Sequence, residues 1–188
     1  MMLVTKSEKA AVFIDGGYIW KIRNKLGITR IAFDKFVEWA ADGSFVLRSY
    51  FYDCLPYQSA SPTEEERRRF SKKQKFFMYL ESLDRFTVRR GRLEYRGCDK
   101  TTGQPIFQQK QVDIWLGLDI ASLAAKNKID KAVLVSGDSD LIPALRVVKE
   151  DGVVVRLIHG PKDTYHKNLW EIADERCEVT KAILERLT

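Results

Sequence analysis

Three short, nearly uninterrupted apolar runs constrain the fold of this chain more than any other feature. They are Ala10–Ile14 (AAVFI), Lys131–Val135 (KAVLV) and Val153–Ile158 (VVVRLI), and the first two end at turn residues. Apolar runs of this length predict strands that are buried on both faces, as in a parallel sheet. Helical patterns lie between the runs, so we expect a three-layer α/β/α sandwich with a mainly parallel central sheet.

The remaining segments carry weaker signals that complete this pattern. Thr63 and Glu66 form a potential capping box, and Pro143 fits a helix only if it lies in the first turn. The expected elements are helices at 18–26, 34–41, 63–83, 111–126 and from the Asp140 turn to 150, strands at 44–53 and 85–96 (the latter a strand or hairpin), a polar loop at 98–109, and a helix-and-strand segment at 165–187.

Length and composition limit the classes of protein that fit this pattern. The chain has 188 residues, 45% of them hydrophobic, so one domain spanning residues 1–188 can bury a substantial core. This content excludes a disordered chain, and no run approaches the roughly 18 apolar residues of a membrane-spanning helix. The N-terminus lacks a secretory signal, and the three cysteines and two histidines lack zinc spacing. We therefore expect a cytoplasmic protein with no membrane partner and no structural zinc, either monomer or homodimer.

Positive charge is concentrated in one excursion of the chain, at about residues 85–110. This segment contributes +5 of the net charge of +6, with seven basic residues against Glu94 and Asp99. Tyr95 and Phe107 are interleaved with the basic residues, an arrangement typical of single-stranded nucleic-acid paths. The alternative is a solvated β-ribbon with arginine on its outer face. The candidate nucleic-acid-binding residues are Arg85, Arg89, Arg90, Arg92, Arg96, Lys100 and Lys110.

Aspartates follow two of the apolar runs. Asp15 ends the first run, and Asp138 and Asp140 follow the second after a Ser-Gly turn. Because the carboxyl ends of parallel strands share one edge of a sheet, these side chains meet if the two strands are neighbours. Asp113, at the start of the helix that precedes the second run, supplies another carboxylate. Carboxylates gathered in this way repel one another unless a cation neutralises them.

The donor chemistry of this acidic group indicates its cofactor. Oxygen ligands without nearby histidine or cysteine select a hard cation, so we expect Mg²⁺ or Mn²⁺. Such an ion lowers the pKa of a bound water and binds phosphoryl oxygens, which favours phosphodiester hydrolysis. Gly16 lets the backbone approach a ligand, and the hydroxyls of Ser136 and Ser139 can bind a water or a phosphate.

Each of these aspartates also has a structural alternative. Asp15 and either Asp138 or Asp140 could cap the helices that follow them, and Asp113 could stabilise a helix dipole. Asp119 lies about 120° around the helix from Asp113, so we expect it to be an accessory or surface residue.

Three sequence blocks occur in a recognisable order. They are AVFIDGG at residues 11–17, Lys110-x-Val-Asp113 with Asp119 behind it, and LVSGDSDL at 134–141 followed by Pro143. Together they resemble the NYN domains of the PIN-like nuclease superfamily, and among these the bacterial LabA-like branch, over residues 10–174. The resemblance implies a PIN-like fold, bound Mg²⁺ or Mn²⁺, and endoribonuclease activity on RNA. The catalytic and metal-binding acids that it implies are Asp15, Asp113, Asp138 and Asp140, with Lys110 and Asp119 as accessory residues.

One position departs from the family pattern. Many NYN domains have Asn three places after the first Asp, where this chain has Tyr18, and that Asn is expected to help hold substrate or a water. The first hypothesis is therefore a metal-dependent endoribonuclease acting on single-stranded RNA. The alternative, favoured by Tyr18, is a catalytically weak RNA-binding or regulatory module. A phosphatase of the haloacid-dehalogenase type is disfavoured, because its nucleophile motif requires Asp where this chain has Gly17.

Overall fold

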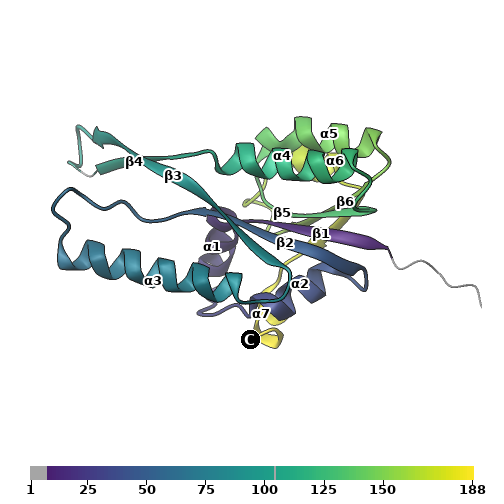
Figure 1. The fold of residues 1–188 in the computed structure, drawn as a ribbon, viewed down its shortest axis with the longest axis horizontal. Helices are drawn as coiled ribbons and strands as arrows, with labels where there is room; N and C mark the ends of the chain where they lie inside the picture. Colours follow the sequence, from purple (N-terminus) through teal and green to yellow (C-terminus); the bar gives the residue numbers. More distant parts are fainter. Residues whose placement is uncertain (1–7, 104) are drawn as a thin grey trace, which may run out of the picture.

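A seven-stranded sheet runs through the middle of the molecule between two layers of helices (Figure 1). The computed structural model describes residues 8–103 and 105–188. The strand order is β4-β3-β2-β1-β5-β6-β7, and all neighbours are parallel except β3 and β4. The expected three-layer α/β/α sandwich is confirmed. The elements are β1 (Lys9–Asp15), α1 (Gly16–Lys25), α2 (Phe33–Ala41), β2 (Phe45–Cys54), α3 (Glu64–Glu81), β3 (Phe86–Cys98), β4 (Pro105–Lys110), α4 (Val112–Ala125), β5 (Lys131–Val135), η1 (Ser139–Leu141), α5 (Ile142–Glu150), β6 (Val154–His159), α6 (Lys167–Ile172), β7 (Glu175–Glu178) and α7 (Lys181–Arg186).

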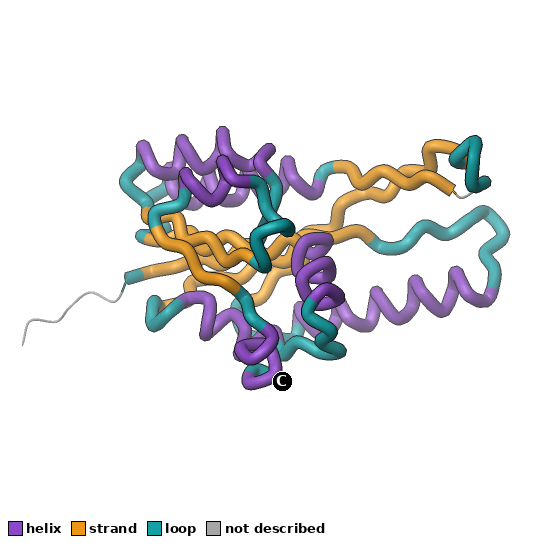
Figure 2. The backbone as a smooth tube through the Cα atoms, turned by 180° about the vertical axis from the view of Figure 1, so that it is seen from behind, coloured by secondary structure: helices purple, strands orange, loops and turns teal. Residues whose placement is uncertain are grey.

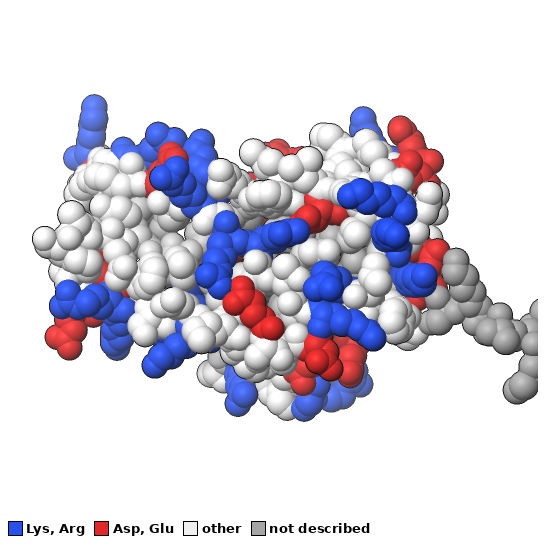
Figure 3. Space-filling model, viewed as in Figure 1, with Lys and Arg blue, Asp and Glu red and all other residues white. Residues whose placement is uncertain are grey.

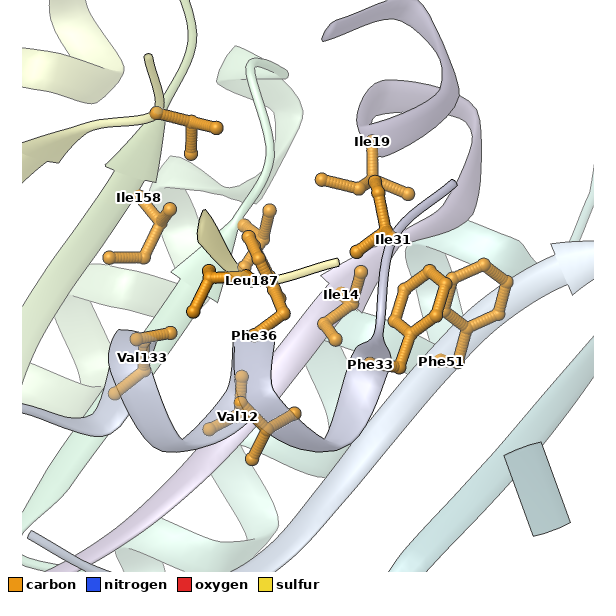
Figure 4. Close-up of a cluster of buried hydrophobic side chains, with 14 of the residues drawn as sticks. Val12, Ile14, Ile19, Ile31, Phe33, Phe36, Phe51, Val133, Ile158 and Leu187 are labelled. Carbon is orange, nitrogen blue, oxygen red and sulfur yellow. The ribbon is translucent and has the colours of Figure 1, made fainter. Parts of the chain in front are cut away.

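Two apolar cores lie on opposite faces of the sheet. Helices α1, α2, α3 and α7 cover one face, and α4, α5 and α6 cover the other (Figures 1 and 2). Strand β1 is buried on both faces: Val12 and Ile14 enter the first core, while Ala11 and Phe13 enter the second. Figure 4 shows part of the first core, where β1 side chains lie near Ile19 of α1. The continuous apolar pattern of the central strands follows from this double burial.

The predicted helix starts are present in the structure. The Thr63 hydroxyl accepts a hydrogen bond from Glu66 N–H and the Glu66 carboxylate accepts one from Thr63 N–H, which completes the capping box of α3. Pro143 lies in the first turn of α5, where its missing N–H has no helical partner to lose. Within the described residues, no helix combines the length and the apolar character needed to cross a membrane.

Strands β3 and β4 form an antiparallel arm that extends past the carboxyl edge of the sheet. β3 pairs with β2 as far as Gly91 and then with β4 from Arg92 onward, so we call residues 92–110 the arm. The arm projects beside α3 and the loop between β2 and α3 (Figures 1 and 2). The predicted polar loop at 98–109 is wrong at Cys98, which ends β3, and over residues 105–109, which belong to β4. This exposed strand is stabilised by cross-strand pairing and buries little, so its sequence lacks an apolar pattern.

Candidate active site

The carboxyl ends of β1 and β5 lie side by side at one edge of the sheet. Ile14 pairs with Val135, so Asp15 and Ser136 are the first residues beyond this register. The neighbouring-strand condition for bringing the predicted acids together is therefore met. This edge is where ligands bind in open parallel sheets.

Asp15 is held by two hydrogen bonds from different segments. Its Oδ1 accepts from Tyr18 N–H at 3.1 Å, which caps α1, and its Oδ2 accepts from the Ser136 hydroxyl at 3.2 Å. The fully buried Ser136 oxygen in turn accepts from Asp138 N–H at 3.2 Å. The capping alternative for Asp15 is thus correct as a description of its backbone contact. The same contacts fix its carboxylate at the sheet edge.

The second acidic segment is a single tight turn. Asp138 Oδ1 accepts from Asp140 N–H at 2.9 Å and caps the short helix η1. On the facing wall, Asp113 lies in the first turn of α4. Gln111 precedes it with a φ of 73°, a left-handed conformation that turns the chain sharply from the arm into α4. Asp113 consequently lies where the arm meets the sheet edge.

The electrostatics of the site reflect the crowding of negative charge. Burial raises the pKa of Asp15 from 3.8 to about 6; the hydrogen bonds from Tyr18 and Ser136 oppose this shift, and the charge of Asp113 adds to it. Burial, followed by the charges of Asp138 and Asp140, also raises the pKa of Asp113. Within the described part of the chain, none of these four aspartates forms an ion pair. The site is therefore short of positive charge.

A cleft of about 590 Å³ opens over these acids. Asp15, Asp113 and Asp138 line the cleft together with Gly17 and Ser139. Asp140 does not line it, but its negative charge raises the pKa of Asp113. A larger cavity of about 810 Å³ lies around Arg85 and Phe86. That cavity is at the amino end of β3, the opposite edge from the one where parallel sheets bind ligands.

The carboxylates of the cleft have the chemistry that a hard divalent cation requires, but their positions do not form a complete metal-binding site. Asp15, Asp113 and Asp138 present carboxylate oxygens to one cleft and form no ion pair with any described residue, and carboxylate oxygens are the ligands that Mg²⁺ and Mn²⁺ prefer. Across residues 8–103 and 105–188, no three His, Cys, Asp or Glu side chains are arranged closely enough to hold a metal ion. Three of the four acids thus line the cleft, but their side chains do not meet at a common point.

The far wall of the cleft consists mostly of residues that the sequence interpretation did not single out. It is formed by Lys21 of α1 and by the segment after β6, including Thr164, Tyr165 and His166. His166 Nδ1 accepts from Asn168 N–H at 3.3 Å, so a neutral ring carries its proton on Nε2. The only sequence signal for this wall was its position after a third buried strand, which ends at the same sheet edge.

Tyr18 connects this far wall to the acids. Its hydroxyl accepts a hydrogen bond from Gly160 N–H at 3.0 Å and lies 3.1 Å from Thr164 Oγ1. The residue is only 6% exposed. Its ring also fills the space beside Gly137, where a Cβ would lie 2.4 Å from Tyr18 Cε2. Tyr18 is therefore a packing residue that holds the loop after β6 in place.

A second buried acid behind the site was also missed. Asp53, at the carboxyl end of β2, forms an ion pair with Lys73 and accepts from Trp20 Nε1–H at 3.1 Å. A Cβ on Gly16 would lie 2.6 Å from Asp53 Oδ2, so the glycine permits this close approach. Gly16 thus serves internal packing, directly beside Asp15.

The remaining accessory candidates lie in different surroundings. Asp119 binds Arg89 through two hydrogen bonds of 2.9 and 3.1 Å and accepts from the Tyr52 hydroxyl, and it does not line the cleft. Lys110 ends β4 at the base of the arm, next to Gln109, which does line the cleft.

The seven basic candidates do not form one continuous stripe. Figure 3 shows basic side chains spread over this face among acidic and uncharged ones. Arg85 lies at the amino end of β3, while Arg89, Arg90 and Arg96 pair with acids. Among the described residues, four of the seven form no ion pair: Arg85, and the three arm residues Arg92, Lys100 and Lys110.

The fold and the acidic edge define a protein with the PIN-like nuclease fold. The chain matches the family model of the NYN domain over residues 9–178 and belongs to that family. No curated protein matches it. Its fold is similar to the crystal structure of a protein of unknown function from Vibrio parahaemolyticus, with a TM-score of 0.66, 20% identity, and coverage of 95% of this chain and 96% of that one. That likeness supports the fold alone.

Proposed function

We propose that the protein is a divalent-metal-dependent endoribonuclease that hydrolyses single-stranded RNA. The observation that carries the proposal is the group of three carboxylates without an ion pair among the described residues, Asp15, Asp113 and Asp138, that line one cleft at the base of a basic arm, with the charge of Asp140 close enough to raise the pKa of Asp113. The order of the three sequence blocks favours the LabA-like branch of the family. We further propose that residues 1–188 act as one domain.

The proposal assigns the roles within the cleft as follows. Asp15, Asp113 and Asp138 hold Mg²⁺ or Mn²⁺, and Asp140 orients a water or a second ion. The bound cation supplies an activated water and neutralises phosphate charge. Lys21 and His166 Nε2–H, on the far wall, donate to the phosphate oxygens. Arg92, Lys100 and Lys110 bind the backbone of the strand as it leaves along the arm.

The test is a cleavage assay on labelled single- and double-stranded RNA and DNA with Mg²⁺, Mn²⁺ or EDTA. Asp15→Asn keeps a capping side chain but removes the charge, so the fold survives. Asp151→Asn, an exposed acid at the end of α5, is the matched control. We expect metal-dependent cleavage of single-stranded RNA by the wild type and the control, and none by Asp15→Asn. Full activity of Asp15→Asn would refute the assignment of Asp15 as a metal-binding catalytic residue.

A catalytically weak RNA-binding module is the second candidate. Tyr18 in place of the family Asn and the absence of a finished metal site among the described residues favour it. This function predicts RNA binding that weakens steeply with salt and no product even with Mn²⁺. The same assay, with a binding measurement at two salt concentrations, separates the two functions.

A further inference from the structure

Three aromatic rings lie around a third, smaller cavity, on the arm. Tyr95 and Phe107 come from the two strands of the arm, and Tyr57 comes from the loop between β2 and α3. The ring centroids lie 5.2 Å (Tyr57–Phe107), 5.9 Å (Tyr95–Phe107) and 6.0 Å (Tyr57–Tyr95) apart. They line a cavity of about 330 Å³ together with Pro56, Pro105, Leu93, Glu66 and Arg69. We call it the aromatic pocket.

The aromatic pocket is not part of either core. Neither core includes the three rings, and Tyr95 and Phe107 are 47% and 39% exposed. Exposed rings grouped around a cavity indicate a binding surface more than a packing one. The three rings contact one another as tilted pairs, within the range of roughly 4.5–7 Å for aromatic contacts, and the exposed part of Tyr95 and Phe107 is the ring surface that a planar ligand can reach.

The register of the arm connects the aromatic pocket to the acidic cleft. Tyr95 lies opposite Phe107, and Leu93 lies opposite Gln109. Because side chains alternate along a strand, Phe107 and Gln109 face the same side of the arm, about 7 Å apart. Phe107 lines the aromatic pocket and Gln109 lines the acidic cleft. One extended ligand can therefore occupy both.

A cationic side chain lines the aromatic pocket. Arg69 of α3 lies 3.9 Å from Glu65 in an exposed ion pair, the kind that water screens, and Glu66 is engaged by the capping box and by the Ser59 hydroxyl. In Figure 3, the surface between the arm and α3 is largely uncharged, with basic side chains and some acidic ones on both sides of it. This arrangement suits a strand with its bases turned into the pocket and its phosphates near the flanking cations.

We propose that the aromatic pocket binds an unpaired nucleobase of the same RNA strand whose phosphate enters the acidic cleft. The inference rests on the proposed function and adds to it a base subsite at a fixed distance from the cleavage point. A paired base cannot enter such a pocket, so the subsite explains a preference for single strands. Stacking on aromatic rings is available to every base, so the subsite tolerates sequence variation.

The test measures binding of a labelled oligouridylate to proteins that all carry Asp15→Asn, in EDTA. Tyr57→Leu combined with Phe107→Leu keeps apolar volume but removes two ring faces. Phe45→Leu is the matched control, because Phe45 is also an exposed ring, 42% exposed, beneath Arg85 at the opposite sheet edge. We expect the double variant to bind about tenfold more weakly, the range of one lost base stack, and the control to bind normally.

A second experiment uses a set of oligonucleotides that each carry one abasic site, at a different position along the strand. We expect one abasic position to weaken binding by the parent and not by the double variant. Unchanged binding by the double variant, or an equal loss of binding in Phe45→Leu, overturns the inference. An apolar segment of a protein partner would then be the ligand that the pocket fits.

Cleavage by proteins with Asp15 intact separates this result from the proposed function. A protein that cleaves RNA with an unchanged KM in the double variant refutes only the base subsite. A protein that shows the position-dependent base contact without cleavage supports the subsite and refutes the nuclease proposal.

Discussion

The Ser136 hydroxyl donates a hydrogen bond of 3.2 Å to Asp15 Oδ2, and this contact joins the carboxyl ends of β1 and β5. It holds one acid in a fixed orientation at the sheet edge while burial makes its charge unfavourable. The site therefore stores an electrostatic cost that a bound cation relieves.

Asp15→Asn should stabilise the metal-free protein at pH 8 and leave its stability unchanged near pH 3.5. Burial raises the pKa of Asp15 from 3.8 to about 6, so the folded protein binds this proton more tightly than the unfolded chain. Stability therefore falls as pH rises through that interval, and the ionised carboxylate costs about 2–3 kcal/mol above it. Urea unfolding in EDTA at both pH values measures the difference. Equal stability of variant and wild type at pH 8 would contradict the electrostatic account.

Tyr18→Phe should lower the free energy of unfolding by about 1–2 kcal/mol. The variant leaves the buried Gly160 N–H without its acceptor while the ring packing is kept. Tyr18→Asn, which restores the common family residue, should cost about 3–5 kcal/mol because it also empties the space beside Gly137. Chemical denaturation checks both values, with Tyr79→Phe on the surface of α3 as control. A Tyr18→Phe protein as stable as the wild type would show that the hydroxyl has no structural role.

Lys73→Met should destabilise the protein by about 3 kcal/mol, and adding Asp53→Asn should recover much of that loss. Asp53 is 5% exposed, and removing Lys73 leaves its carboxylate buried without a cation. In the double variant no uncompensated charge remains. A double-mutant cycle by urea unfolding measures this coupling, and additive losses would show that the two side chains do not depend on each other.

Gly137→Ala should lower both stability and RNA cleavage. The added Cβ would lie 2.4 Å from the Tyr18 ring and 2.5 Å from Thr164 O, so the loop that carries His166 must move. Overpacking of this kind costs about 1–3 kcal/mol. Gly117→Ala, within α4, is the control, because its Cβ would meet Ala144 of α5 at 3.6 Å, an ordinary van der Waals contact. Normal cleavage by Gly137→Ala would show that the loop position does not matter to the reaction.

The sequence predicted the parts of the site that depend on buried strands. The apolar runs before Asp15 and before Ser136 identify β1 and β5, and strands buried on both faces have few alternative places in a parallel sheet. The turn after β5 then places Asp138 beside Asp15. Helical periodicity also separated Asp119 from Asp113, as its contact with Arg89 now shows.

The parts that could not be predicted depend on contacts between distant, polar segments. Strand β4 is exposed at every residue except Lys110, so no burial pattern distinguishes it from a loop. His166 reaches the cleft through a loop whose path is set by Tyr18, and Asp53 depends on Lys73 from another element. Tyr57 meets the arm only because the loop between β2 and α3 runs beside it. None of these relationships has a local sequence signature.

Anomalous diffraction from crystals soaked in Mn²⁺ tests the central claim most directly. The account predicts a strong peak in the cleft bounded by Asp15, Asp113 and Asp138, and no peak there in crystals of Asp15→Asn. A cleft without anomalous density at saturating Mn²⁺ would contradict it.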